Sequence, residues 1–457
     1  MKVGLNRPFL NYVRMCAIGF MFNFGVYFFW LVIPIILKDY DVNSIFIGLA
    51  PTFTFGTAGF LSILTGYLSD IIDAECLVSL ASVLNGVACF MLGLVCAAHT
   101  NYYLFVLSLF IQGISFGLFY SPIETLISLH SEEGKEGRNL AIFFTVCYLG
   151  TSFGFLCGGS VILLCGNTFT LYIVGFISLF IFFVVPRKFN DIKKGSTKVK
   201  ESFEDDVKET KSVSLSTESS SEASSLVNSP QNTESKTEEK EPVKKVSHYR
   251  EKVERWTFFL VSCFVSVVIY GSLAIITDQY VGYAEDEGIV LEGVSKQSSV
   301  FVGVFLFILS IFETISFVIM GITDVWVNKA FLNLLAHLTI IILGLFLYYV
   351  KVGWVLVIFV SPVLGLVCGY EYQANVVYAL NLKSRPGFFL GVNEFVANVT
   401  YCVCPFIAGV MMDFIDRDWC ILLIIVLNVF GLIIATALHF FGAVLVYKKR
   451  ITDESGN

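Results

Sequence analysis

The 457-residue chain is poor in charge over most of its length. Asp, Glu, Lys and Arg make up only 15% of the sequence, and 27 of these 67 residues lie in the single stretch 188–254. Hydrophobic residues reach 56% and aromatic residues 15%, which is far above the content of a soluble domain of this size. Outside 188–254, the composition is therefore typical of a protein whose solvent is lipid.

Several functional signatures are missing as well. The formal net charge of −7 leaves no basic surface for nucleic acid, so we set nucleic-acid binding aside. No G-x-x-x-x-G-K-[ST] loop, metal-ligand cluster or nucleophile motif occurs, which argues against ATP drive, a metal site and an enzyme, and we expect no cofactor. Ten of the twelve cysteines lie within apolar runs without disulfide or metal spacing, so we interpret them as small buried hydrophobic residues.

Long apolar runs are abundant. A bilayer-spanning helix needs about 20 mostly apolar residues. Twelve segments meet that length, six on each side of the charged stretch, near 12–37, 45–69, 75–98, 102–128, 139–164, 168–187, 256–281, 298–322, 328–350, 353–380, 388–412 and 419–446. The sequence therefore predicts an all-α, multi-pass membrane protein with twelve transmembrane helices.

Basic residues in the short loops predict the orientation. With the N-terminus in the cytoplasm, eleven Lys or Arg residues fall on the cytoplasmic side and four on the other. Both termini and the charged stretch are then cytoplasmic, although no sorting signal identifies the membrane.

The domain division follows from the same pattern. We expect a six-helix bundle over 1–187, a linker over 188–254, a second bundle over 255–447 and a tail over 448–457, in a monomer. The linker is rich in Ser, Glu and Lys and has three aromatic residues, so we expect it to be a disordered tether. The alternative is a phosphorylation target, because Ser219, Ser220 and Ser221 beside Glu222 are accessible acceptors.

Two loops repeat between the halves. GYLSD at 66–70 follows the second span and GITD at 321–324 follows the eighth, so Asp70 and Asp324 occupy matching places. A carboxylate at the end of one helix can bond to the N-terminal amides of a neighbour. We expect Asp70 to hold the start of the eleventh span near Arg385, and Asp324 the start of the fifth near Arg138. These contacts would lock a cytoplasmic gate.

A second internal repeat relates the fourth and fifth spans to the tenth and eleventh. QGISFGLFYSP at 112–122 and GTSFGFLCGG at 150–159 are matched by GLVCGYEYQAN at 365–375 and PFIAGVMMD at 405–413. The closely spaced glycines let helix backbones approach within the membrane. With the six plus six layout, these motifs closely resemble the major facilitator superfamily everywhere except in the linker.

That resemblance implies two pseudo-symmetric six-helix bundles that rock around a central cavity, lined mainly by spans 1, 4, 7 and 10. Three departures matter. IIDAE follows Asp70 where the family usually has basic residues, Leu109 stands where many drug–proton antiporters have Arg, and Phe155 stands where their fifth-span motif has Pro. A drug-antiporter assignment is therefore not supported.

Four glutamates lie in the spans: Glu124, Glu313, Glu371 and Glu394. At 1.5 Å per residue, the last three lie roughly 5, 8 and 9 Å to the cytoplasmic side of their span centres. Because no Lys or Arg lies deep in a span, they can exchange protons. We expect Glu371, with Glu313 or Glu394 as partner, to couple protons to transport from the second half. The alternatives are protonated carboxyls bonded between helices and, for Glu124, a place at the cytoplasmic interface.

Further candidates are polar or aromatic residues on the presumed cavity helices, each with packing as its alternative role. They are Asn23, Tyr27 and Trp30 in the first span, Gln112 and Tyr120 in the fourth, Tyr270 and Asp278 in the seventh, and Gln373 and Asn375 in the tenth. A cavity with carboxylates and no cationic residue favours neutral or cationic solutes.

The leading hypothesis is a secondary active transporter of a small solute, a symporter or uniporter that works by alternating access, with coupling to protons left open. The alternative is a non-transporting relative that acts as a sensor or trafficking partner. A central cavity with converging polar residues would favour transport, and one filled by Phe and Leu would favour the alternative.

Overall fold

The computed structural model describes residues 7–39, 44–98, 102–131, 135–185, 241–294, 298–323, 325–382 and 386–455. Within these ranges the chain is helical without strands, and twelve helices are long and apolar enough to cross a membrane. The first half holds α1 (Arg7–Asp39), α2 (Ser44–Ser69), α3 (Ala74–Ala98), α4 (Tyr102–His130) and α5 (Glu136–Val184). The second half holds α7 (Glu241–Asp278), α8 (Tyr280–Asp286), α9 (Ser298–Ile322), α10 (Ala330–Tyr349), α11 (Gly353–Val355), α12 (Ser361–Leu380), α13 (Pro386–Phe414) and α14 (Trp419–Ser455). The predicted fold class is confirmed.

Two spans are not single regular helices. α5 contains two spans, Glu136–Gly158 and Cys165–Val184, and bends at Gly166, whose φ of 76° suits glycine. α11, the π-helical turn η1 (Leu356–Val360) and α12 together form one span, Gly353–Leu380. The six spans on each side of the linker are therefore complete in the described part of the chain.

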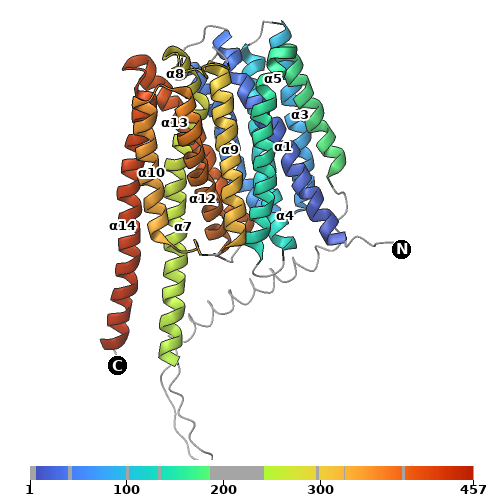
Figure 1. Ribbon diagram of the computed structural model, residues 1–457. Helices are drawn as coiled ribbons and strands as arrows, with labels where there is room; N and C mark the ends of the chain where they lie inside the picture. The colour runs from blue at the N-terminus through green and yellow to red at the C-terminus, as the bar shows by residue number, and fades with distance from the viewer. Residues whose placement is uncertain are drawn as a thin grey trace, which may run out of the picture. The chain divides into compact units, whose positions relative to one another are not determined.

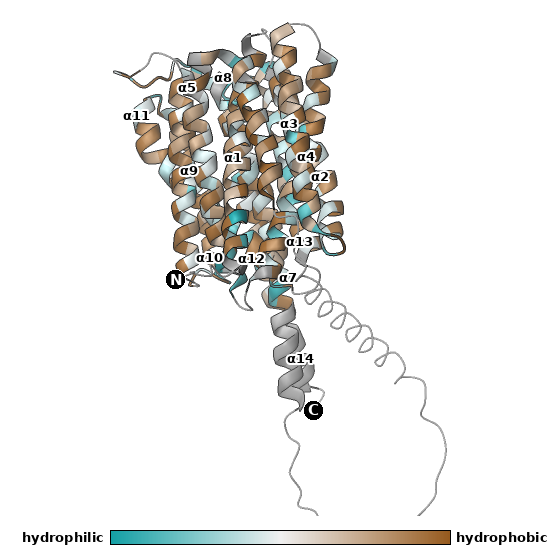
Figure 2. Ribbon diagram, turned by 90° about the vertical axis from the view of Figure 1, so that its right-hand side faces the viewer, coloured by the Kyte–Doolittle hydropathy of each residue, from teal (hydrophilic) through white to brown (hydrophobic). Residues whose placement is uncertain are grey.

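The outer faces of the helices are apolar, as a lipid solvent requires. Large side chains such as Phe60, Phe176, Phe183 and Phe430 are more than half exposed. Figure 2 shows hydrophobic residues along the lengths of the helices. Because lipid surrounds them, these side chains need no protein partner.

The predicted duplication is visible in the packing of each half. A Cβ on Gly113 would press on the carbonyl oxygen of Thr54 in α2, and a Cβ on Gly365 would press on that of Leu309 in α9. One turn further on, Gly117 and Gly369 face the same two helices. Small residues therefore let α4 approach α2, and α12 approach α9, in the same way.

The two halves meet along α2 and α13 and along α5 and α9. Figure 1 shows α5 beside α9. A Cβ on Gly391 of α13 would lie 2.5 Å from the carbonyl oxygen of Ser62, and one on Gly59 would lie 3.3 Å from the Cβ of Asn398. The backbones of α2 and α13 are therefore close for much of their length.

The spans belong to one compact unit, within 7–185 and 255–442, and residues 241–254 and 443–455 belong to a second unit. α7 begins at Glu241. Residues 241–254, which were assigned to the linker from the sequence, are therefore the first part of α7. The rest of the predicted linker, including Ser219, Ser220, Ser221 and Glu222, lies outside the described residues.

We expect Gly365→Ala to destabilise the protein by roughly 1 to 3 kcal/mol, because the new methyl group would overpack α12 against Leu309. The matched control is Gly303→Ala in α9, where a Cβ would meet no atom within 4 Å. That change should leave stability unchanged or raise it by up to about 1 kcal/mol. Thermal unfolding of the two purified variants measures this difference in stability. Equal melting temperatures would contradict the close packing of α12 against α9 at Gly365.

Candidate functional site

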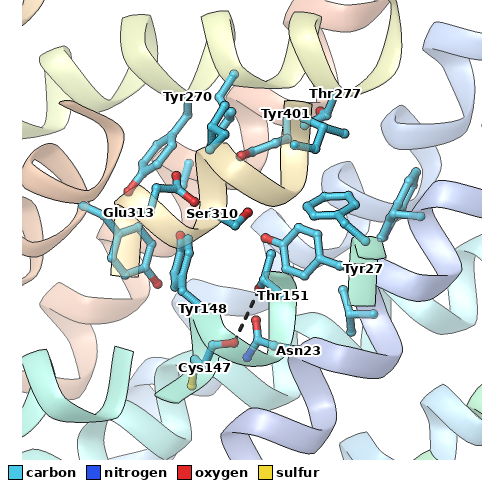
Figure 3. A pocket seen from close by; sticks show the side chains of 18 of the residues that line it. Asn23, Tyr27, Cys147, Tyr148, Thr151, Tyr270, Thr277, Ser310, Glu313 and Tyr401 are labelled. Atoms are coloured by element: carbon cyan, nitrogen blue, oxygen red, sulfur yellow. Dashed lines mark hydrogen bonds between the residues drawn. The ribbon is translucent and has the colours of Figure 1, made fainter. Parts of the chain in front are cut away.

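A central cavity lies between the two halves and receives side chains from both. Figure 3 shows Asn23, Tyr27, Tyr148, Tyr270 and Glu313 pointing into it. Its described lining comes from α1, α2, α4, α5, α7, α9, α12 and α13: Asn23, Val26, Tyr27, Trp30, Leu31, Phe55, Phe116, Tyr120, Phe143, Phe144, Cys147, Tyr148, Thr151, Phe155, Tyr270, Leu273, Thr277, Asp278, Val302, Leu306, Leu309, Ser310, Glu313, Tyr372, Glu394, Ala397, Asn398 and Tyr401. The cavity therefore combines apolar walls with carboxyl, amide and hydroxyl groups.

The cavity holds its acidic groups at different depths. On α9 the lining residues run from Val302 to Glu313, which are roughly 16 Å apart along the helix axis. Glu313 and Glu394 lie toward the end of the bundle where α13 begins, and Asp278 is the last residue of α7, toward the opposite end. We call these the Asp70 end and the Asp413 end, after a carboxylate that lies at each.

A tyrosine hydroxyl joins two buried glutamates from different halves. The hydroxyl of Tyr372 in α12 lies 3.3 Å from Oε1 of Glu124 in α4 and 3.4 Å from Oε1 of Glu394 in α13. All three residues are buried or nearly so. We call Glu124, Tyr372 and Glu394 the carboxyl trio.

Both contacts of the carboxyl trio can be hydrogen bonds at the same time only when one carboxyl carries a proton. A phenol has one O–H proton, so Tyr372 can donate to only one of the two carboxyls. The second contact is a hydrogen bond only when that carboxyl is protonated and donates to the phenol oxygen. Within the described residues, Oε2 of Glu124 has no hydrogen-bond partner, which makes a charged Glu124 costly. The trio can therefore hold and release a proton.

Aromatic rings surround Tyr372 on both sides. Its ring centroid lies 4.8 Å from that of Phe144 and 5.8 Å from that of Tyr148, both on α5. The rings of Tyr270 on α7 and Phe317 on α9 lie 5.9 and 6.0 Å away. These contacts fix the orientation of the phenol between the two carboxyls.

The predicted site residues divide into two groups. Those that line the cavity are Asn23, Tyr27, Trp30, Tyr120, Tyr270, Asp278, Glu313 and Glu394. Those that are not among its lining residues are Gln112, Glu371, Gln373 and Asn375. The cavity therefore gathers part of the predicted set, including two of the three predicted coupling glutamates.

The second group makes contacts between helices. Gln112 bonds to Asn85 of α3 at 3.5 Å within the first half. Gln373 donates to the carbonyl oxygen of Gly137 in α5 at 3.0 Å, and Asn375 donates to Ser266 of α7. The alternative of packing or interhelical roles fits these residues.

Glu371 and Tyr372 are neighbours on α12 with different surroundings. Glu371 is buried, and its Oε1 has no hydrogen-bond partner in the described part of the chain. Successive residues of a helix point about 100° apart, so only one of them faces the cavity, and that residue is Tyr372. Tyr372 was not among the residues predicted from the sequence, although it lies in the GYEYQAN motif at 369–375.

The interface interpretation of Glu124 is wrong. Glu124 lies six residues before the end of α4, or roughly 9 Å along the helix axis, and its side chain is fully buried. The hydroxyl of Tyr372 in α12 donates to this first-half carboxyl, so Glu124 is connected to the second half. The residues next to Glu124 in the sequence do not indicate that Tyr372 is its partner.

At the Asp70 end, a carboxylate holds the start of α13. Oδ1 and Oδ2 of Asp70 each accept a hydrogen bond at 3.2 Å, from the backbone amides of Gly387 and Phe388. These amides are unbonded within the helix, and the helix dipole favours negative charge there. Arg138 is exposed on α5, whereas Asp324 and Arg385 lie outside the described residues.

A reciprocal contact exists at the Asp413 end. Oδ2 of Asp413, near the end of α13, accepts a hydrogen bond at 3.1 Å from the amide of Ile45, in the first turn of α2. Thr52 donates to the carbonyl oxygen of Cys402 at 2.9 Å within the same helix pair. Each helix of the α2–α13 pair therefore supplies a carboxylate to the N-terminus of the other. Asp413 was not among the residues predicted from the sequence, although it ends the PFIAGVMMD motif at 405–413.

Comparison with known proteins agrees with this architecture. A family model described as Major Facilitator Superfamily matches residues 15–400, which is most of the 457-residue chain. None of the curated proteins matches the chain.

We expect Asp70→Asn to loosen the start of α13 by roughly 0.5 to 2 kcal/mol, because a neutral amide is a weaker partner for the helix N-terminus. Hydrogen exchange should then quicken in peptides that contain Gly387 and Phe388. Asp413→Asn should instead quicken exchange at the start of α2. Asp73→Asn, in the same loop as Asp70 and exposed, is the control. Unchanged exchange at both helix starts would contradict the reciprocal contacts.

Proposed function

The chain belongs to the Major Facilitator Superfamily, and from that premise we propose that this membrane transporter moves a small solute by alternating access, driven by protons bound at the carboxyl trio. The solute occupies the central cavity, and the two six-helix halves rock around it. Both termini lie in the cytoplasm, as the loop charges predict.

The observation that carries proton coupling is the sharing of Tyr372 between Glu124 and Glu394. Glu124 belongs to the first half, and its two partners belong to the second. A rocking motion that separates the halves takes Tyr372 away from Glu124 and admits water. An isolated carboxyl in water readily loses its proton, whereas the buried trio retains one. Proton release is therefore tied to the arrangement of the halves.

The α2–α13 pair supplies the gates at its two ends. Asp70 secures one end and Asp413 the other, and each bond joins one half to the other. Opening the cavity toward either side breaks the bonds at that end and leaves those at the opposite end intact. This arrangement supports alternation, because the pair can pivot without separating completely.

The non-transporting alternative fits the cavity less well. A cavity filled by Phe and Leu would have favoured a sensor or trafficking partner. Here Glu313, Asn398 and Thr277 lie among the lining residues together with several tyrosines. A solute-sized space with hydrogen-bonding groups from both halves supports transport.

We expect Glu394→Gln, Glu124→Gln and Tyr372→Phe each to reduce pH-gradient-driven solute accumulation in proteoliposomes about tenfold or more, equivalent to ~1.4 kcal/mol. The reason is that each change removes a group through which the trio holds its proton. Solute exchange without a pH gradient should persist, because the cavity and gates remain. A panel of labelled solutes, measured with and without the gradient, provides the readout.

Two variants make this test specific. Glu75→Gln alters a mostly buried carboxyl in the first turn of α3, outside the cavity lining, and should leave accumulation unchanged. Glu371→Gln tests the assignment made from the sequence. If Glu371→Gln abolished gradient-driven accumulation while the three trio variants retained it, the trio would not be the coupling site.

A further inference from the structure

The charge of the cavity has one sign. Asp278, Glu313 and Glu394 line it, and none of its described lining residues is Lys, Arg or His. Glu394 is engaged with Tyr372, so Glu313 and Asp278 are the carboxyls left to face a solute. An anion would meet negative or neutral acidic groups without a compensating charge, whereas a cation would find a counter-ion.

Several hydrogen-bond donors of the cavity are used by the protein. Both amide side chains donate to backbone carbonyl oxygens: Asn23 to Gly19 at 2.9 Å and Asn398 to Glu394 at 2.6 Å. Thr151 and Thr277 likewise donate within their own helices. The carboxyl oxygens of Glu313 and Asp278 are acceptors that carry negative charge when ionised, which is what an ammonium group needs.

Three buried polar atoms in the cavity lining have no partner among the described residues. They are Oδ2 of Asp278, the hydroxyl oxygen of Tyr270 and the indole nitrogen of Trp30, in residues that are 7%, 3% and 8% exposed. Buried polar groups are rarely left unbonded in proteins. Figure 3 shows Tyr270 pointing toward the same space as Glu313. These atoms indicate that the cavity is built around a polar occupant.

The walls are suited to the apolar part and the charge of an organic cation. Aromatic rings follow one another across the cavity, with centroid separations of 5.0 Å from Trp30 to Phe55, 4.9 Å from Phe55 to Tyr401, 6.1 Å from Tyr401 to Tyr270 and 5.9 Å from Tyr270 to Tyr372. The faces of Tyr and Trp rings attract cations and also bury apolar surface. An inorganic cation would leave these walls without a partner.

We propose that the solute is an organic cation with one positive charge and an apolar or aromatic body, that Glu313 is its counter-ion, and that Asp278 attracts it at the Asp413 end. This inference rests on the proposed transport function and adds the chemical class of the solute. In this proposal, the carboxyls that bind the solute, Glu313 and Asp278, are different residues from those of the proton-binding carboxyl trio.

Direct binding to the purified full-length protein tests the proposal with labelled benzyltrimethylammonium, which has a permanent charge and one ring. We expect saturable binding. Tetramethylammonium, which lacks the ring, should compete several-fold less well. Benzenesulfonate, benzyl alcohol and glucose, which are an anion and two neutral molecules, should not compete.

Glu313→Gln should weaken binding of benzyltrimethylammonium about tenfold, because the counter-ion is lost. Asp278→Asn and Tyr270→Leu provide independent tests if Glu313→Gln unfolds, and each should weaken binding several-fold. Glu75→Gln should bind as the unaltered protein does. The melting temperature of each variant establishes that it is folded.

The outcomes for solute class and for transport are separable. Absence of saturable binding to the folded protein, or equal competition by glucose or benzenesulfonate, would overturn the cation assignment. Gradient-driven uptake of a neutral or anionic solute in the same liposomes would leave the transport proposal standing and refute only the solute class. Cation binding without any gradient-driven uptake would support the solute class and refute the transport proposal.

Discussion

Lipid offers no hydrogen bonds, and this constraint determines how the chain is held together. The backbone of each span satisfies its polar groups within its own helix, so the helices associate through close packing rather than by hiding apolar surface from water. Glycines meet that requirement at equivalent places in both halves, where Gly113 approaches α2 and Gly365 approaches α9. Glycines also let α2 and α13, which belong to different halves, approach each other closely. The backbones of these two helices therefore contact each other closely along the joint between the halves.

The same constraint governs the polar groups that remain. Helix ends have unbonded amides, and here a carboxylate from the opposite half satisfies them: Asp70 at the start of α13 and Asp413 at the start of α2. Inside the bundle, the carboxyls of Glu124 and Glu394 share the hydroxyl of Tyr372. In each case a polar group of one half depends on the other half, so the bonds that stabilise this arrangement are also those that a change of arrangement must break.

Glu394 connects the proposed proton site to the proposed solute site. It belongs to the carboxyl trio and also lines the cavity with Glu313. The tyrosine that bonds to it is part of the aromatic series that continues through Tyr270 and Tyr401. In the proposed mechanism, solute binding, proton binding and the separation of the halves therefore all affect the same side chains. That proximity gives a physical route for coupling within one cavity.

The sequence by itself determined the twelve spans, the duplication and the family resemblance, because span length, apolar composition and glycine spacing act locally along the chain. It also predicted Asp70 at the start of the eleventh span and eight candidates from the first, fourth, seventh, eighth and eleventh spans that line the cavity, namely Asn23, Tyr27, Trp30, Tyr120, Tyr270, Asp278, Glu313 and Glu394.

Only the tertiary structure decided which of Glu371, Tyr372 and Gln373 faces the cavity, because that choice depends on the rotation of α12 against its neighbours. It likewise brought Glu124 to Tyr372, which is 248 residues away in the chain, and Asp413 to α2. Contacts between spans depend on helix rotation and depth, and local composition fixes neither.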